Sequence, residues 1–337
     1  MHAAKGRLVS TFALAAALTL VSSSVSAGGW TLVDIGALIG GSTDGTAINE
    51  VGQVVGVELS AGYGAPTRGF LYDSNSGRIV DLGSLGGTYT YPYAINNAGQ
   101  VVGQSTTSGR SHRAFLYESG NMTDLGTFGG KSSYAVGINN AGQIAINADS
   151  RAILYDHGTV TELGSLGGSY TTARAINDAG QIAGYSLTNG TRPMDAFLYS
   201  QGKMNDVGAS IGGSSNYAYG LNSAGQVVGW ALVKNNQQAF LYGGAARNPL
   251  FGPSGSVAYS INDQGQIVGY AGGTGGFLYA SGKMTRLDTL PEVVAAGWDT
   301  VNPLYINNRG QIVGEAYIND ISHAILLSPA QSVPPSQ

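Results

Sequence analysis

The side chains that could carry acid–base or metal chemistry are few and widely spaced in this 337-residue chain. Hydrolysis of a glycosidic bond needs two carboxyl groups at a fixed separation, and a zinc site needs several ligands close together. The candidate acids on the face with the variable loops are Asp44, Asp195, Glu292, Asp299 and Asp320, and the histidines beyond His2 are His112, His157 and His323. This scatter predicts no catalytic site, no metal site and no cofactor.

Binding chemistry has more candidates, in segments rich in hydroxyls and aromatic rings and poor in charge. Examples are "GGTYTYPY" (86–93) and "GGSSNYAY" (212–219). Tyrosine and tryptophan rings beside Ser, Thr and Asn suit the stacking and hydrogen bonding of a sugar or a peptide. The predicted ligand-binding residues are Tyr89, Tyr91, Tyr134, Tyr170, Tyr217, Trp298 and Asp299. The alternative is that the tyrosines pack between repeat units or at strand edges, and that 291–305 merely caps the fold.

One pattern, Ile or Leu followed by N-x-x-G-Q, occurs seven times, roughly 40–45 residues apart, which is typical of a repeat protein. An Asn that begins a turn hydrogen-bonds the backbone two residues on, and a Gly that ends it adopts the left-handed conformation. The motif therefore predicts a hairpin turn. Its Asn and Gly residues are Asn49 and Gly52, Asn96 and Gly99, Asn139 and Gly142, Asn177 and Gly180, Asn222 and Gly225, Asn262 and Gly265, and Asn307 and Gly310.

The order of strands within a repeat predicts the architecture. Each unit reads as a hairpin, a third strand such as "AFLY" and a fourth such as "TDLG", and four short strands per repeat make a propeller blade. The chain starts with a fourth-type strand (30–36) and ends after a third-type strand (323–329). We therefore predict an all-β, seven-bladed β-propeller of four-stranded antiparallel blades over 28–329, whose ring is closed by the N-terminal strand.

Other all-β architectures fit this pattern less well. A parallel β-helix has a shorter repeat and needs no exchange of a terminal strand, and a two-sheet sandwich needs no near-identical units. A membrane barrel needs strands of about 9–11 residues with alternating lipid-facing side chains, whereas these runs are shorter.

The two ends of the chain differ from the repeats. Residues 1–27 have Lys5 and Arg7 before an apolar run and end in small residues, which predicts a secretory signal peptide; a short membrane anchor is the alternative. Residues 330–337 are polar and contain Pro, which predicts a disordered tail. The chain has no cysteine and a net charge of −4, and it has no basic cluster for nucleic acid. We expect a secreted or periplasmic monomer with no membrane insertion after signal removal.

The combined order "SHRAFLY…MTDLGTFGG…YAVGINNAGQ" (111–143) resembles the HAF repeat family, probable extracellular bacterial proteins named for a His-Ala-Phe tripeptide. The resemblance covers about 30 to 329 and implies secretion and repeats. The chain departs from the tripeptide, because Arg113, Arg151, Asp195 and Gln238 stand before the Ala and only His323 keeps the histidine.

These observations predict a non-enzymatic binding or surface-interaction module with an unknown glycan or protein ligand. We place its site on the face with the variable loops, opposite the repeated turns, because functional residues usually sit on variable loops of a rigid scaffold. The alternatives are a polysaccharide-active enzyme that uses acids such as Asp299 with Glu292, and a purely structural envelope protein. The Gln after each turn Gly, for example Gln100, is predicted to hydrogen-bond near the turn.

Overall fold

The computed structural model describes residues 29–60, 65–189, 194–244 and 250–330. The signal peptide predicted at 1–27 lies outside these residues, as does the tail predicted at 330–337 except for Ala330. The described residues form 28 strands and three short helices. The prediction of an all-β protein built mainly of four-stranded antiparallel sheets is confirmed.

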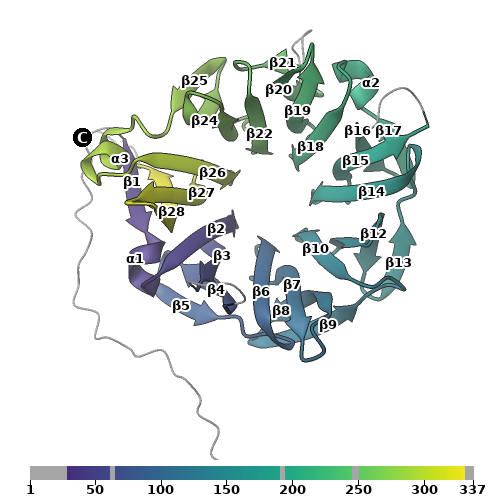
Figure 1. The fold of residues 1–337 in the computed structure, drawn as a ribbon, viewed down its shortest axis with the longest axis horizontal. Coiled ribbons are helices and arrows are strands. Elements are labelled where there is room, and N and C mark those ends of the chain that lie inside the picture. The colour runs from purple at the N-terminus through teal and green to yellow at the C-terminus, as the bar shows by residue number, and fades with distance from the viewer. Residues whose placement is uncertain (1–28, 61–64, 190–193, 245–249, 331–337) are drawn as a thin grey trace, which may run out of the picture.

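The first strand of each repeat lies innermost, and these strands converge on a common centre (Figure 1). Each of them ends at the Ile or Leu directly before the turn Asn, so the motif fixes where the inner strand stops. The inner strands are β2 (Ser42–Ile48), β6 (Gly86–Ile95), β10 (Ser133–Ile138), β14 (Gly167–Ile176), β18 (Asn216–Leu221), β22 (Ser256–Ile261) and β26 (Thr300–Ile306).

The second and third strands follow outward in each sheet. The second strands are β3 (Gln53–Leu59), β7 (Val101–Thr107), β11 (Ile144–Ala148), β15 (Ile182–Thr188), β19 (Val227–Val233), β23 (Ile267–Ala271) and β27 (Ile312–Ile318). The third strands are β4 (Thr67–Asp73), β8 (His112–Glu118), β12 (Arg151–Asp156), β16 (Asp195–Ser200), β20 (Asn236–Tyr242), β24 (Gly275–Ala280) and β28 (Ile321–Pro329). The third-strand rings of Phe115, Phe197 and Phe240 are fully buried. They belong to apolar clusters that hold neighbouring repeats together.

The fourth strands form the outer edge. They are β5 (Arg78–Asp81), β9 (Asn121–Gly126), β13 (Thr159–Glu162), β17 (Lys203–Asp206), β21 (Leu250–Phe251), β25 (Lys283–Arg286) and, from the N-terminal part of the chain, β1 (Trp30–Asp34). β1 pairs antiparallel with β28, from Trp30 opposite Pro329 to Asp34 opposite Ile325. The strand expected at 30–36 is shorter, because the Asp34 carboxylate accepts a hydrogen bond from the Ala37 N–H at 2.8 Å and caps helix α1 (Ile35–Ile39).

The strands of the described residues form six sheets. Five have four strands, and the sixth has eight, β2 to β9, because a single parallel bridge between Thr67 and Tyr89 joins β4 to β6. The two remaining helices, α2 (Gly208–Ile211) and α3 (Pro291–Ala295), are as short as α1. Across the described segments, the longest apolar helix falls well short of the length that crosses a bilayer.

Candidate functional site

The turn after each inner strand is held by a buried Asn side chain, as the second repeat shows. The Oδ1 atom of Asn96 accepts from the backbone N–H groups of Ala98 and Gln100 at 3.1 and 3.0 Å. Its Nδ2 atom donates to Gln100 Oε1 at 2.7 Å and to the carbonyl oxygen of Asn139 at 3.1 Å. Gly99 has a φ of 78°, so it takes the left-handed conformation expected of it.

Together the seven turn Asn residues make a closed cycle of hydrogen bonds. Each Nδ2 donates to the carbonyl oxygen of the Asn in the next repeat at 2.9–3.2 Å, and Asn307 donates back to Asn49. The Asn side chains are 2–7% exposed. Each also donates to the Gln of its own turn at 2.7–2.9 Å, which confirms the hydrogen bonding predicted for those glutamines.

A second layer lies outside this cycle, formed by the residue that follows each turn Asn. Asn97 Oδ1, for example, accepts from the Glu50 N–H at 2.9 Å, and Asp263 Oδ1 accepts from the Ser223 N–H at 2.9 Å. Asn97, Ser223 and Asp263 are exposed. These bonds tie neighbouring repeats together at the solvent edge of the turns.

A β-bulge interrupts every inner strand three residues before the turn Asn. In β6, for instance, the pairing with β7 skips from Pro92 to Ala94, which leaves Tyr93 unpaired. A bulge turns its extra side chain in a new direction, and each bulged residue lines one central cavity. The bulged residues are Thr46, Tyr93, Val136, Arg174, Tyr219, Tyr259 and Leu304.

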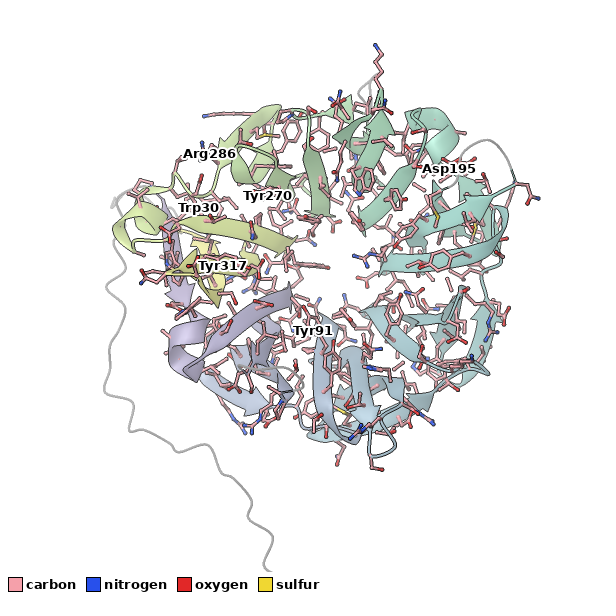
Figure 2. All side chains as sticks on the ribbon, viewed as in Figure 1. Trp30, Tyr91, Asp195, Tyr270, Arg286 and Tyr317 are labelled. Carbon is pink, nitrogen blue, oxygen red and sulfur yellow. The ribbon has the colours of Figure 1, made fainter. Side chains whose placement is uncertain are left out.

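The central cavity has a volume of about 460 Å³ and lies along the axis on which the inner strands converge. Tyr91 and Tyr134 add two further rings to its wall, and Figure 2 shows Tyr91 beside the central opening. Tyr93 lies 4.9 Å from Tyr91, measured between ring centroids. Burial raises the pKa of Tyr91 to about 12 and also that of Tyr134, so these hydroxyls stay neutral hydrogen-bond donors at physiological pH.

Arg174 is the one charged side chain among the residues that line this cavity. Its guanidinium carbon lies 4.8 Å from the ring centre of Tyr219, a cation–π distance. The arginine charge also lowers the pKa of Tyr134 and Tyr185 against the larger effect of burial. The wall of the central cavity is therefore rich in tyrosine rings and carries one cationic side chain.

A pair of carboxyl groups lies between the first and last repeats. The pKa of Asp44 is raised to about 6, mainly by burial and then by a hydrogen bond to Glu315 and the charge of that residue, against the opposing effect of a hydrogen bond from Ser322. Asn302 Nδ2 donates to Glu315 Oε1 at 3.1 Å, and Tyr317 also hydrogen-bonds Glu315. The Asp44 carboxyl group therefore keeps its proton up to about pH 6.

Glu315 also lines a second cavity of about 390 Å³, which meets the central one at Tyr259 and Leu304. Its wall comes from two neighbouring sheets, with Tyr259 and Tyr270 on β22 and β23, and Asn302 and Tyr317 on β26 and β27. Figure 2 shows Tyr270 and Tyr317 on these adjacent sheets. We call this space the side cavity.

The five tyrosines expected in loops lie instead on inner strands: Tyr89 and Tyr91 on β6, Tyr134 on β10, Tyr170 on β14 and Tyr217 on β18. The expectation fails because the Gly-Gly segments begin these strands or precede them closely. Tyr91 and Tyr134 line the central cavity. Tyr89 stacks on Tyr91 at 6.2 Å, and Tyr217 stacks on Trp230 at 4.4 Å.

Trp298 and Asp299 do not form the pair that the sequence suggested. Trp298 is 8% exposed and belongs to an apolar cluster with Leu287 and Val293, so its ring stabilises the fold and is closed to a ligand. Asp299 is exposed at the start of β26. Glu292 is buried and accepts weakly from the Trp30 N–H at 3.4 Å, which anchors β1 to α3.

The remaining candidate acids and histidines lie apart. Asp195 is buried, accepts from Asn216 Nδ2 at 2.9 Å, and lies away from the central opening in Figure 2. His323 Nδ1 lies 2.9 Å from Asp34, where it joins β28 to β1. In the parts of the chain that the structure describes, no three His, Asp or Glu side chains come together as a metal site.

The sequence analysis missed Tyr93, Arg174, Tyr219, Tyr259 and Glu315. The signal for the first four is their fixed place three residues before a turn Asn. That position reads as an ordinary strand residue unless the bulge is known.

Comparisons with known proteins agree with this architecture. A family model described as "Protein of unknown function (DUF3466)" matches residues 39–192, and no curated protein matches. Among solved structures, YCF48 bound to D1 peptide has 8% identity and a TM-score of 0.53 over 92% of this chain and 99% of its own. PorZ, a surface component of the type-IX secretion system of Porphyromonas gingivalis, has 12% identity and a TM-score of 0.54 over 84% of this chain and 46% of its own.

A puromycin-hydrolyzing peptidase of Mycobacterium tuberculosis has 12% identity and a TM-score of 0.55 over 86% of this chain and 51% of its own. The chain thus spans about half the length of PorZ and of this peptidase. At these identities the likeness concerns the fold, which is a propeller-like arrangement of β repeats.

Proposed function

We propose that this protein is a secreted, non-enzymatic binding module of HAF-repeat type, which binds a glycan or protein ligand at the mouth of its central cavity. The observation that carries the proposal is the bulge in every inner strand. The bulged position varies from Thr and Val to Tyr and Arg while the turn Asn stays the same. A scaffold that repeats its turns and varies its cavity wall is suited to recognition.

The same proposal includes a seven-bladed propeller closed by β1. The bridge between β4 and β6 is a single residue pair, which supports counting the eight-stranded sheet as two blades. The pairing of β1 with β28 and the return of the Asn cycle from Asn307 to Asn49 support closure. Closure covers the outer edge of β28 with β1. An exposed edge strand can pair with another chain and cause aggregation.

Ligand chemistry follows from the cavity wall. Neutral tyrosine hydroxyls donate hydrogen bonds and tyrosine rings stack on sugar or side-chain planes, and Arg174 adds a charged donor. YCF48, the propeller-like neighbour of similar length, was solved with a peptide, so peptides belong beside glycans among the ligands to test. Export to the periplasm or the cell exterior is proposed from residues 1–27.

One observation favours the alternative of a polysaccharide-active enzyme, namely the paired carboxyl groups of Asp44 and Glu315. Retaining and inverting glycosidases hold their carboxyl groups at least about 5 Å apart, so that the sugar or a water fits between them. Asp44 and Glu315 hydrogen-bond each other directly. This contact leaves no room for a scissile bond, so the pair fits binding better than hydrolysis.

The test is a screen of the mature protein on glycan and peptide arrays, followed by affinity measurements on a Tyr93→Val, Tyr219→Leu double variant. Val136 and Leu304 occupy the same bulge in other repeats, so the scaffold tolerates these side chains. Tyr155→Leu on the third strand β12, outside the central cavity, is the matched control.

We expect the double variant to lose at least tenfold in affinity and the control to bind as the wild type does. Absence of any ligand in both screens would refute the binding function. Hydrolysis of a polysaccharide that is abolished by Asp44→Asn would establish the enzyme instead.

A further inference from the structure

The residues that line the side cavity differ in chemistry from those that line the central cavity beside it. Tyr259, Tyr270 and Tyr317 supply three rings to it and Glu315 supplies a carboxylate. We propose that the side cavity binds a basic group of the ligand, a primary ammonium or a guanidinium, such as the side chain of a lysine or arginine in a peptide. The inference rests on the proposed binding function and names the chemistry of one part of that site.

The tyrosine rings that line the side cavity are the first observation that supports a bound cation. The face of a tyrosine ring attracts an ammonium or guanidinium group, and more strongly where water is excluded. Burial and the charge of Glu315 raise the pKa of Tyr317 to about 12, and burial raises the pKa of Tyr259. Both rings therefore stay neutral and keep their attraction for a cation across the physiological range.

An excess of hydrogen-bond acceptors is the second, independent support. Asn302 Oδ1, on the wall of the side cavity, and Asp44 Oδ1, on the carboxyl group that hydrogen-bonds Glu315, are buried from solvent and have no hydrogen-bond donor. A buried acceptor without a donor is costly, and none of the residues lining the side cavity is a Lys or an Arg. An ammonium brings three donors and a guanidinium five, so a basic group supplies what this corner lacks.

Charge completes the argument. The groups that face Asp44 are Glu315 and Tyr317 on β27, Tyr91 on β6 and Ser322 on β28, and none of them is cationic. Below about pH 6 the Asp44 carboxyl group keeps its proton, and above that pH it is ionised beside Glu315. A bound cation favours the ionised form of Asp44, so cation binding releases the proton and strengthens as the pH rises through 6.

Isothermal titration of the mature protein with n-butylammonium and with propylguanidinium tests this directly, with n-pentanol as the neutral probe of similar shape. We expect binding of both cations at pH 7.5 that is about tenfold weaker at pH 5, as release of one proton requires. Pentanol is expected to bind at least tenfold more weakly at pH 7.5. Absence of cation binding at pH 7.5, or equal binding of pentanol, would overturn the proposal.

Two variants separate a site from general attraction to an acidic protein. Glu315→Gln is expected to lose at least tenfold in cation affinity, whereas Glu58→Gln on β3, outside the side cavity, is expected to lose none. Asp44→Asn is expected to flatten the pH dependence. Equal losses in the Glu315 and Glu58 variants would contradict a local site, and calcium that displaces the ammonium would indicate a metal site in its place.

The wild-type pH series needs no variant to fold, so the proposal stays testable if Glu315→Gln is unstable. The outcomes also separate this inference from the proposed function. Array ligands that bind while butylammonium does not would refute the cation site alone. Ammonium binding with no array ligand would refute the wider binding function and leave the cation site standing.

Discussion

Replacing Asn96 by alanine tests whether the Asn cycle holds the repeats together. The substitution deletes four hydrogen bonds, two accepted by Oδ1 and two donated by Nδ2. The residue is 3% exposed, so the Asn139 carbonyl oxygen loses a donor that water does not easily replace. At a net value near 1 kcal/mol for each bond, and with some rehydration of the turn, we expect a loss of about 3 kcal/mol.

The neighbouring Asn97→Ala is the matched control, because the two residues are of one type and adjacent. Asn97 is exposed, and the bond its side chain makes to the preceding repeat is the one accepted from the Glu50 N–H. We expect its loss to cost less than about 1 kcal/mol. Urea unfolding followed by circular dichroism measures both variants against the wild type.

A third variant checks the geometry of the bond network. Asn96→Asp keeps the acceptor for Ala98 and Gln100 and replaces the donor with an oxygen that faces the carbonyl oxygen of Asn139 and Gln100 Oε1. Its pKa should therefore rise, and the variant should lose stability as the pH increases from 4 to 7. Asn96→Ala and Asn97→Ala variants of equal stability would refute the structural role of the cycle.

Three further predictions follow. Asp44→Asn removes a carboxyl group whose pKa is raised to about 6; the folded protein binds more protons than the unfolded chain between pH 4 and 6, so wild-type stability falls across that window. The variant should be about 1–2 kcal/mol more stable than the wild type at pH 7.5, after allowance for partial solvent screening, and equal to it at pH 4; equal melting temperatures at both pH values would contradict this. Deleting residues 28–36 should leave the outer edge of β28 unpaired and cause aggregation, and a truncated monomer with an unchanged melting temperature on size-exclusion chromatography and calorimetry would show that β1 is dispensable. Phe115→Ala, at a fully buried third-strand ring, should cost about 3–5 kcal/mol in urea unfolding, while a cost below about 1 kcal/mol would mean that the cluster re-forms around the cavity.

Local rules made the repeat unit predictable. Asn and Gly at fixed spacing specify one turn, and β-branched runs on either side of it specify two strands, so the hairpin at Asn96 and Gly99 follows from residues close in sequence. The pairing of β1 with β28 was also foreseen, because a leftover strand at each end of the repeats has one natural partner.

The residues of the candidate site could not be predicted from local sequence patterns, because bulges and contacts between distant parts of the chain position them. A bulge reverses which face a side chain takes, so Tyr93 and Arg174 read as strand residues of no special direction. Asp44 and Glu315 come from opposite ends of the chain and meet because the first and last repeats lie side by side. Trp298 was predicted to bind a ligand because tryptophan rings suit stacking, yet its ring is buried in an apolar cluster of the core.

Comparing the seven repeats with one another separates positions that the fold keeps constant from positions that vary. The turn Asn is the same in every copy because each one bonds the next repeat, and a change in any one would break the cycle. The bulged position three residues earlier is free of that constraint, since the ladder between the first and second strands skips it and its side chain lines the cavity. It is Thr, Tyr, Val, Arg, Tyr, Tyr and Leu in turn. Selection for folding alone does not require such variety at one place, so the ligand binding that we propose should weaken on substitution of the bulged residues and be unaffected by substitutions on the outer strands.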